Sequence, residues 1–173
     1  MELFDVIEKR RSVRKYVNKP VPEESIRKVL NAARLAPSWA NKQCWRFIVV
    51  TDPELRLKLG EAMNNNPNKS CYVDAPVDIV VCAKRHDSGI HDGKEYFMFD
   101  LGLAMENLVL AAADEGLGTC IIGWFEAGPI KQLLHIPENY EVVVVTPLGY
   151  PAEVPNTRLR KELDDIASYN GFN

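Results

Sequence analysis

A long run with helical periodicity constrains the fold of this chain more than any other feature of its 173 residues. Between residues 96 and 115, apolar side chains recur every three or four positions, as on one face of a helix. These side chains are Leu101, Ala104, Met105, Leu108, Ala111 and Ala112. Gly116 follows as the expected residue beyond the helix end, because glycine tolerates left-handed backbone. The many alanines predict a central helix that packs closely on more than one side.

Four shorter helices and a loop are also predicted. Residues 2–11 place Leu3, Val6, Ile7 and Arg10 on one helical face. A second helix runs from Pro22, at the first helical position, to just before Pro37. A third begins after the capping residue at position 52 and extends to about residue 63. A loop is expected over residues 64–68, and a short helix over 127–134.

Four apolar segments predict strands, at residues 45–50, 77–83, 120–123 and 142–145. The second is largely apolar and is therefore expected in the middle of a sheet. The alternation of strands with helices by itself suggests a parallel α/β sheet. The spacing does not reveal the order of the strands, so other arrangements of the sheet stay open.

Composition and charge exclude several classes of function. Hydrophobic residues make up 46% of the chain, enough for a core, and its length fits one domain covering residues 1–173. The net charge of −3 argues against a nucleic-acid partner. We expect no membrane association, because no signal peptide or 18-residue apolar run is visible. The four scattered cysteines contain no CxxC pair, which favours a cytoplasmic protein.

Three polar segments are candidates for a binding site. Five of the seven residues at 9–15 are cationic, and a second basic cluster lies at 158–161. Arginine forks match phosphate oxygens, although each cluster taken alone is more readily a solvated surface segment. The third segment, residues 36–45, mixes amides and hydroxyls with two tryptophans, a composition that suits recognition of a flat heterocycle. Taken alone, it is equally a loop whose tryptophans cover the rim of the core.

Together these segments resemble the nitroreductase family of FMN-dependent oxidoreductases. Arg10-Arg11-Ser12-Val13-Arg14 resembles the phosphate-binding motif of that family, and residues 37–45 resemble its Pro-Ser-x-x-Asn-x-Gln-Pro-Trp motif. Residues 100–110, 116–119 and 123 resemble its central helix and the strand that follows, while 147–151 and 158–161 resemble its closing segments. The likeness covers nearly the whole chain. It implies an α+β, three-layer fold, with a central mixed sheet flanked by helices and a C-terminal arm on the partner subunit.

The resemblance also implies a cofactor site shared between two subunits of a homodimer. The arginines and serine of residues 10–14, with the two arginines at 158 and 160, would hold the FMN phosphate. Residues 37–43 would contact the flavin from the other subunit. Two residues near 122 would lie against the ring, one offering a backbone N–H near N5, and Asn68 would contact the ring edge. The implied residues are Arg10, Arg11, Ser12, Arg14, Pro37, Ser38, Trp39, Asn41, Gln43, Asn68, Ile122, Gly123, Arg158 and Arg160.

The implied reaction transfers hydride from NADH or NADPH through the flavin to an electron-poor small molecule such as a nitroaromatic or quinone. No catalytic side chain is assigned, because the cofactor carries the chemistry. Specialised flavin chemistry (dehalogenation, dehydrogenation or flavin fragmentation) stays open, as does a non-enzymatic flavin-binding or redox-sensing module. The sequence departs from the family in two ways. Cys44 replaces a proline, and the connection over residues 83–96 is short. The short connection predicts an open flavin face. His86-Asp87 and His91-Asp92 in that connection lack the spacing of a metal site, so no metal is expected.

Overall fold

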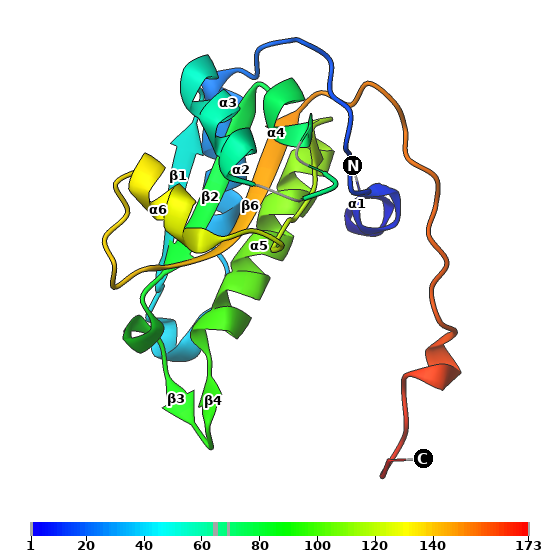
Figure 1. The fold of residues 1–173 in the computed structure, drawn as a ribbon. Helices are drawn as coiled ribbons and strands as arrows, with labels where there is room; N and C mark the ends of the chain where they lie inside the picture. The colour runs from blue at the N-terminus through cyan, green and yellow to red at the C-terminus, as the bar shows by residue number, and fades with distance from the viewer. Residues whose placement is uncertain (1, 64–65, 69, 173) are drawn as a thin grey trace.

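The chain folds around one four-stranded sheet, in a computed structural model that describes residues 2–63, 66–68 and 70–172 (Figure 1). The strands lie in the order β1 (Trp45–Val50), β2 (Val77–Ala83), β6 (Glu141–Gly149) and β5 (Gly118–Thr119). Each neighbouring pair is antiparallel. The parallel sheet suggested by the alternation of elements is therefore wrong, because helical connections can return the chain in either direction. An isolated parallel bridge between Ser12 and Thr119 makes the sheet mixed.

Helices cover both faces of the sheet and give the molecule three layers (Figure 1). On one face, Val77, Ile79 and Val81 of β2 join a core with α2 (Glu23–Arg34) and α5 (Phe97–Asp114). On the other face, Val80 and Cys82 join a second core with α3 (Pro53–Ala62), α4 (Ser70–Asp74) and α6 (Ala127–Leu133). Every residue of β2 is buried, as predicted for a central strand.

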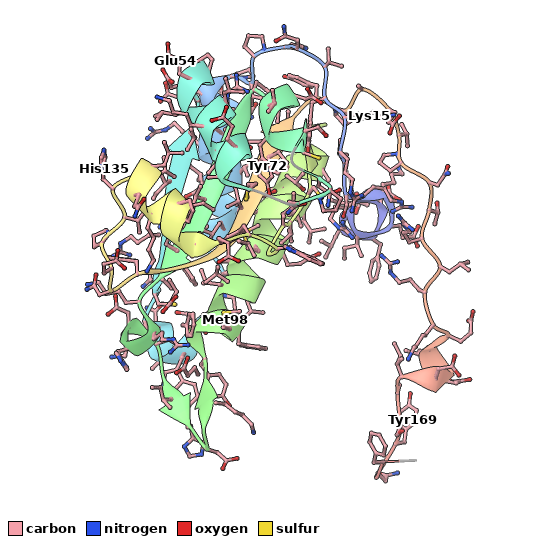
Figure 2. All side chains as sticks on the ribbon, viewed as in Figure 1. Lys15, Glu54, Tyr72, Met98, His135 and Tyr169 are labelled. Carbon is pink, nitrogen blue, oxygen red and sulfur yellow. The ribbon has the colours of Figure 1, made fainter. Side chains whose placement is uncertain are left out.

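The long helix α5 confirms the strongest expectation from the sequence. Its buried residues form a stripe that packs on the sheet and on α2. Gly116 has φ +72°, and the N–H of Leu117 donates to the carbonyl of Ala112, which closes the helix end as predicted. Met98 and Phe99 lie outside the stripe, with 53% and 62% of their surfaces exposed. Figure 2 labels Met98 near the lower end of the helix.

Several predicted boundaries need correction. The first helix, α1, covers only Leu3–Lys9, and Pro22 caps α2 instead of starting it. The strand expected at residues 120–123 is wrong: β5 is Gly118–Thr119, and Ile122 forms only an isolated bridge to Val145. Strand β6 is longer than predicted. Helix α4 and a hairpin of β3 (Ile90–His91) and β4 (Lys94–Glu95) were not expected. Residues 64 and 65 of the predicted loop lie outside the described residues.

The C-terminal arm, residues 151–172, leaves the end of β6 and runs down one side of the molecule (Figure 1). It contains one short 3₁₀ helix, Leu163–Asp165. Apolar side chains along it are exposed, including Val154, Leu159, Ile166, Tyr169 and Phe172. Figure 2 shows Tyr169 near the tip of the arm, well away from the helices and the sheet. The arm therefore carries apolar surface that its own chain leaves uncovered.

Candidate functional site

The basic segment at residues 10–14 is held against the sheet by one buried side chain. Val13 is buried, and its N–H donates to the carbonyl of Thr119 at 2.8 Å. Gly118 makes this approach possible, because a Cβ there would lie 2.6 Å from Val13. In extended backbone neighbouring side chains point to opposite sides, so burying Val13 turns Ser12 and Arg14 outward.

The start of the arm brings the second basic cluster to the first. The N–H of Val17 donates to the carbonyl of Tyr150, and the N–H of Ala152 donates to that of Lys15, both at 2.9 Å. These bonds direct the arm back past residues 10–14. The two segments enclose a pocket of about 390 Å³, here called the basic pocket. It is lined by Arg10, Arg11, Ser12, Arg14, Glu153, Pro155, Asn156, Thr157, Arg158 and Arg160.

The basic pocket is strongly cationic. It is lined by five arginines and one carboxylate, that of Glu153, which also pairs with Lys15 at 2.9 Å. Arg11 is fixed by bonds to the carbonyls of Glu8 and Arg10 and to the hydroxyl of Thr157. Guanidinium groups gathered in this way repel one another unless an anion lies between them. The fork geometry and the hydroxyl of Ser12 suit a phosphate group.

Three further predicted residues, Asn68, Ile122 and Gly123, lie on the same side of the molecule as the basic pocket. Asn68 accepts a hydrogen bond from Nε of Arg14 at 2.9 Å, which places the 66–68 loop beside the basic segment. The amide of Asn66 in turn donates to the carbonyl of Trp124 at 2.7 Å. This bond ties the loop to the segment containing Ile122 and Gly123. Gly123 is exposed, whereas Ile122 is buried beneath it.

The remaining predicted residues form a separate loop at residues 37–43, here called the Trp39 loop. Three of its non-glycine residues adopt positive φ: Ala40 at 44°, Asn41 at 57° and Gln43 at 50°. The N–H of Gln43 donates to the hydroxyl of Ser38 at 2.9 Å, which closes the loop internally. Such backbone conformations persist only where surrounding contacts enforce them, and they cluster at binding and catalytic sites.

Asp100 connects the Trp39 loop to α5. This carboxylate is only 1% exposed, and its Oδ1 accepts the backbone N–H of Trp39 at 2.9 Å. Its Oδ2 accepts the hydroxyl of Ser88 at 2.7 Å and lies 3.8 Å from Sγ of Cys44. Burial, together with the nearby Asp100 charge, raises the pKa of the Cys44 thiol to about 11, so the thiol stays protonated and can donate.

The hairpin formed by β3 and β4 packs beside the Trp39 loop. The Trp39 ring lies 4.3 Å from that of Tyr96 and 6.5 Å from that of His91, measured between centroids. Gly89 lies beneath Trp39, where a Cβ would come within 2.2 Å of the indole. The short connection that was expected to leave an open flavin face thus holds a hairpin in contact with the predicted flavin loop. Among the described residues, no group of histidine, cysteine, aspartate or glutamate could hold a metal ion.

The two groups of predicted residues do not meet within one chain. The Trp39 loop is fixed to the N-terminal part of α5 through Asp100, whereas Ser12 pairs with Thr119, beyond the C-terminal end of that helix. From position 100 to position 114 the helix advances by fourteen steps of 1.5 Å, or about 21 Å. Figure 1 shows the hairpin and the basic segment at opposite ends of α5. A second chain would be needed to complete a site containing both.

Sequence reasoning missed the residues that support the Trp39 loop, namely Asp100, Ser88, Gly89 and Tyr96. One signal for Asp100 was available. It occupies the apolar stripe of α5 between Phe97 and Leu101, where a carboxylate is unexpected unless it is hydrogen bonded. No local pattern in the sequence pointed to Ser88 or Gly89, because their roles depend on the unexpected hairpin.

The chain matches the family model described as "Nitroreductase family" over residues 7–71 and 66–150. A protein of Methanothermobacter thermautotrophicus, provisionally named NADH dehydrogenase/NAD(P)H nitroreductase, is 39% identical over 91% of this chain and 82% of its own length. Iodotyrosine deiodinase 1 of Rattus norvegicus is 30% identical over 95% of this chain and 68% of its own length.

The fold also matches solved structures. A protein of Desulfovibrio desulfuricans, provisionally called a nitroreductase and solved in complex with FMN, is 25% identical to this chain. It superimposes with a TM-score of 0.86, over all of this chain and 99% of the other. In the part of the chain that the structure describes, no helix is long and apolar enough to cross a membrane.

Proposed function

This chain belongs to the nitroreductase family of oxidoreductases, and from that premise we propose that it binds FMN and uses NADH or NADPH as electron donor. When bound, FMN would supply the hydride transfer, from the nicotinamide to an electron-poor acceptor such as a nitroaromatic or a quinone, in a ping-pong cycle. The tasks left to the protein are to anchor the cofactor, to support negative charge on it and to leave one ring face accessible.

The single observation that carries this proposal is the basic pocket. Five arginines and the Ser12 hydroxyl converge on a space of about 390 Å³ with one opposing carboxylate. This set of donors fits the phosphate of a mononucleotide. Arg10, Arg14 and Arg160 would bind its oxygens, while Arg11, already bonded to Thr157, would hold the arm in place. Cations and N–H groups near the ring would stabilise the added negative charge when the flavin is reduced.

The flavin ring would be bound from two chains. Ile122 and Gly123 lie on the same side as the basic pocket, and the exposed backbone at Gly123 is accessible to a ring laid against it. Ser38, Trp39 and Asn41 would come from a second copy, since within one chain they lie at the other end of α5. We therefore propose a homodimer with two FMN sites at its interface.

The test of this function is identification of the bound flavin followed by anaerobic reduction. The purified protein is expected to be yellow and to release FMN, and not FAD, on denaturation, as measured by chromatography. Mixing with NADH or NADPH in a stopped-flow instrument should bleach the flavin, and a nitroaromatic or quinone should restore its colour. A colourless protein that cannot be reconstituted with FMN would refute the proposal. Bound FMN that neither nicotinamide reduces would instead support a binding or sensing module.

Reductive dehalogenation is a second candidate, favoured by the 30% identity to iodotyrosine deiodinase 1 over 95% of this chain. In that reaction the reduced flavin provides two electrons, and with one proton the carbon–halogen bond is replaced by carbon–hydrogen as halide leaves. Chemically reduced protein should then release halide from a halogenated phenol faster than it reduces a nitroaromatic. This candidate would be excluded if the reduced protein released halide from the phenol no faster than free reduced FMN does.

A further inference from the structure

We propose that Asp100 is a positioning residue, whose buried carboxylate sets the Trp39 loop and the β3–β4 hairpin in the geometry that receives the flavin of the partner subunit. This inference rests on the proposed FMN site and extends it to a residue that does not touch the cofactor. The observation behind it is that one carboxylate joins three separate parts of the chain: the Trp39 loop, the start of β1 and the connection before the hairpin.

The three contacts are satisfied by a group that accepts hydrogen bonds at two atoms. The N–H of Trp39 cannot rotate away or change role, so an acceptor must face it. The hydroxyl of Ser88 and the thiol of Cys44 approach the other carboxylate oxygen. An ionised carboxylate can satisfy all of these donors at once, and bonds to an ionised acceptor are roughly twice as strong as neutral ones.

The Trp39 loop needs such a support because its own backbone is strained. Ala40, Asn41 and Gln43 lie at positive φ, a conformation that side-chain-bearing residues keep only when neighbouring contacts outweigh its cost. The bond from Trp39 to Asp100 fixes the start of this strained stretch to a rigid helix. Through Ser88 the same carboxylate also fixes the connection that leads into the hairpin, and Tyr96, directly after β4, packs its ring on Trp39. Loop and hairpin are thus positioned together.

Removal of the carboxylate should release the loop while the sheet and the basic pocket remain intact. We expect Asp100→Ala to raise the dissociation constant of FMN roughly ten- to hundredfold, as for loss of a charge-assisted hydrogen bond. Asp100→Asn should retain part of the affinity, because its amide oxygen can still accept from Trp39 while its NH₂ donates to Ser88. Ser88→Ala should have a smaller effect than Asp100→Ala. Glu54→Ala, on the first turn of α3, is the control and should bind like the wild type.

Mixed dimers separate positioning from general damage to the fold. Asp100→Ala chains are combined with Arg160→Ala chains, and FMN binding is titrated after subunit exchange. If Asp100 acts on the Trp39 loop alone, each mixed dimer has one site with both lesions and one with neither. Half of the mixed-dimer sites should then bind FMN with wild-type affinity. If Asp100→Ala damages its whole subunit, no site of wild-type affinity appears, and the inference fails.

The outcomes also distinguish this inference from the proposed function. A wild-type dimer that binds no FMN would refute the function itself. A wild-type dimer that binds FMN, beside an Asp100→Ala dimer that binds it equally well, would refute only the role of Asp100. If Asp100→Ala does not fold, Asp100→Asn and Ser88→Ala give the test. Wild-type affinity for FMN in both variants would overturn the inference.

Discussion

Arg10 and Arg160 come from opposite ends of the sequence and line one pocket. If they bind the FMN phosphate, Arg10→Ala or Arg160→Ala should each weaken binding by about 1.5–3 kcal/mol, the size of a charge-assisted hydrogen bond. Titration with FMN should show a dissociation constant roughly ten- to hundredfold higher. Lys161→Ala is the matched control, because Lys161 does not line the pocket. Unchanged affinity in an arginine variant would remove that residue from the phosphate site.

Asp78 allows a separate prediction about stability and pH. It is fully buried in β2, and neither carboxylate oxygen has a hydrogen-bond partner among the described residues, nor do Nε of Arg56 and the hydroxyl of Tyr72. Figure 2 shows Tyr72 within the body of the molecule, between α4 and the sheet. Burial raises the pKa of Asp78 well above its ordinary value, although the charge of Arg56 opposes this.

Because the folded state favours the neutral acid, Asp78 lowers stability progressively as pH rises from its unfolded pKa, about 3.9, toward its folded pKa. Asp78→Asn removes this ionisation and should raise the free energy of unfolding at neutral pH. Urea denaturation at several pH values checks this, since the advantage of the variant should disappear at low pH. A variant less stable than the wild type at neutral pH would indicate that Asp78 is ionised and partnered in the folded protein.

The basic residues could be identified from the sequence, whereas the support of the Trp39 loop could not. Runs such as Arg10-Arg11 are dense in one stretch of chain, so composition alone identifies them. Asp100 is one carboxylate in an apolar helix, and its partners lie 12 and 61 residues away in the chain. Contacts of that kind depend on how the elements pack, which no local pattern records.

At the scale of elements, the hairpin and the Trp39 loop should move together. Gly89→Ala places a methyl group within 2.2 Å of the Trp39 indole, so the ring must be displaced. We expect weaker FMN binding, by about tenfold or more, and a changed tryptophan fluorescence spectrum. Gly128→Ala is the control. Gly128 lies on α6, and a Cβ there would meet nothing within 4 Å. Tight FMN binding by Gly89→Ala would show that the hairpin tolerates the shift.

Helices and strands were predicted correctly where a periodic pattern of apolar residues extends over many positions. Helix α5 and strands β1 and β2 have the expected positions, and Asp52 caps α3 as expected, accepting from the N–H of Leu55 at 2.9 Å. Short elements escaped prediction, because the two-residue strands β3, β4 and β5 are too short for an alternation pattern. The direction of neighbouring strands could not be predicted either, because the sequence pattern shows which faces are buried and not whether paired strands are parallel or antiparallel.

At the scale of the whole molecule, exposed apolar surface supports a homodimer. The arm exposes side chains along its length, from Val154 to Phe172, and α5 exposes Met98 and Phe99. Light scattering should therefore give the mass of two chains. Flavin retention and thermal stability should both fall on dilution, because a dimer is stabilised by its own concentration.

A mixed-subunit experiment tests whether the sites are shared. Arg10→Ala chains are combined with Asn41→Ala chains under exchange conditions. A mixed dimer would contain one site with both substitutions and one with neither, so wild-type FMN binding should return at half of its sites. If each chain builds its own site, every site keeps one substitution and no binding is recovered. A monomer that holds stoichiometric FMN would end the shared-site model.

The separation of the Trp39 loop and the basic pocket by the length of α5 has a consequence for biosynthesis. If the FMN sites are shared as proposed, a newly made chain completes neither site alone, and loading with FMN follows the encounter of two chains. The amount of holoprotein would then rise with about the square of the chain concentration when expression is low. Scarce synthesis would leave a disproportionate share of colourless chains, and the dose of the gene would control activity more steeply than it controls the amount of protein.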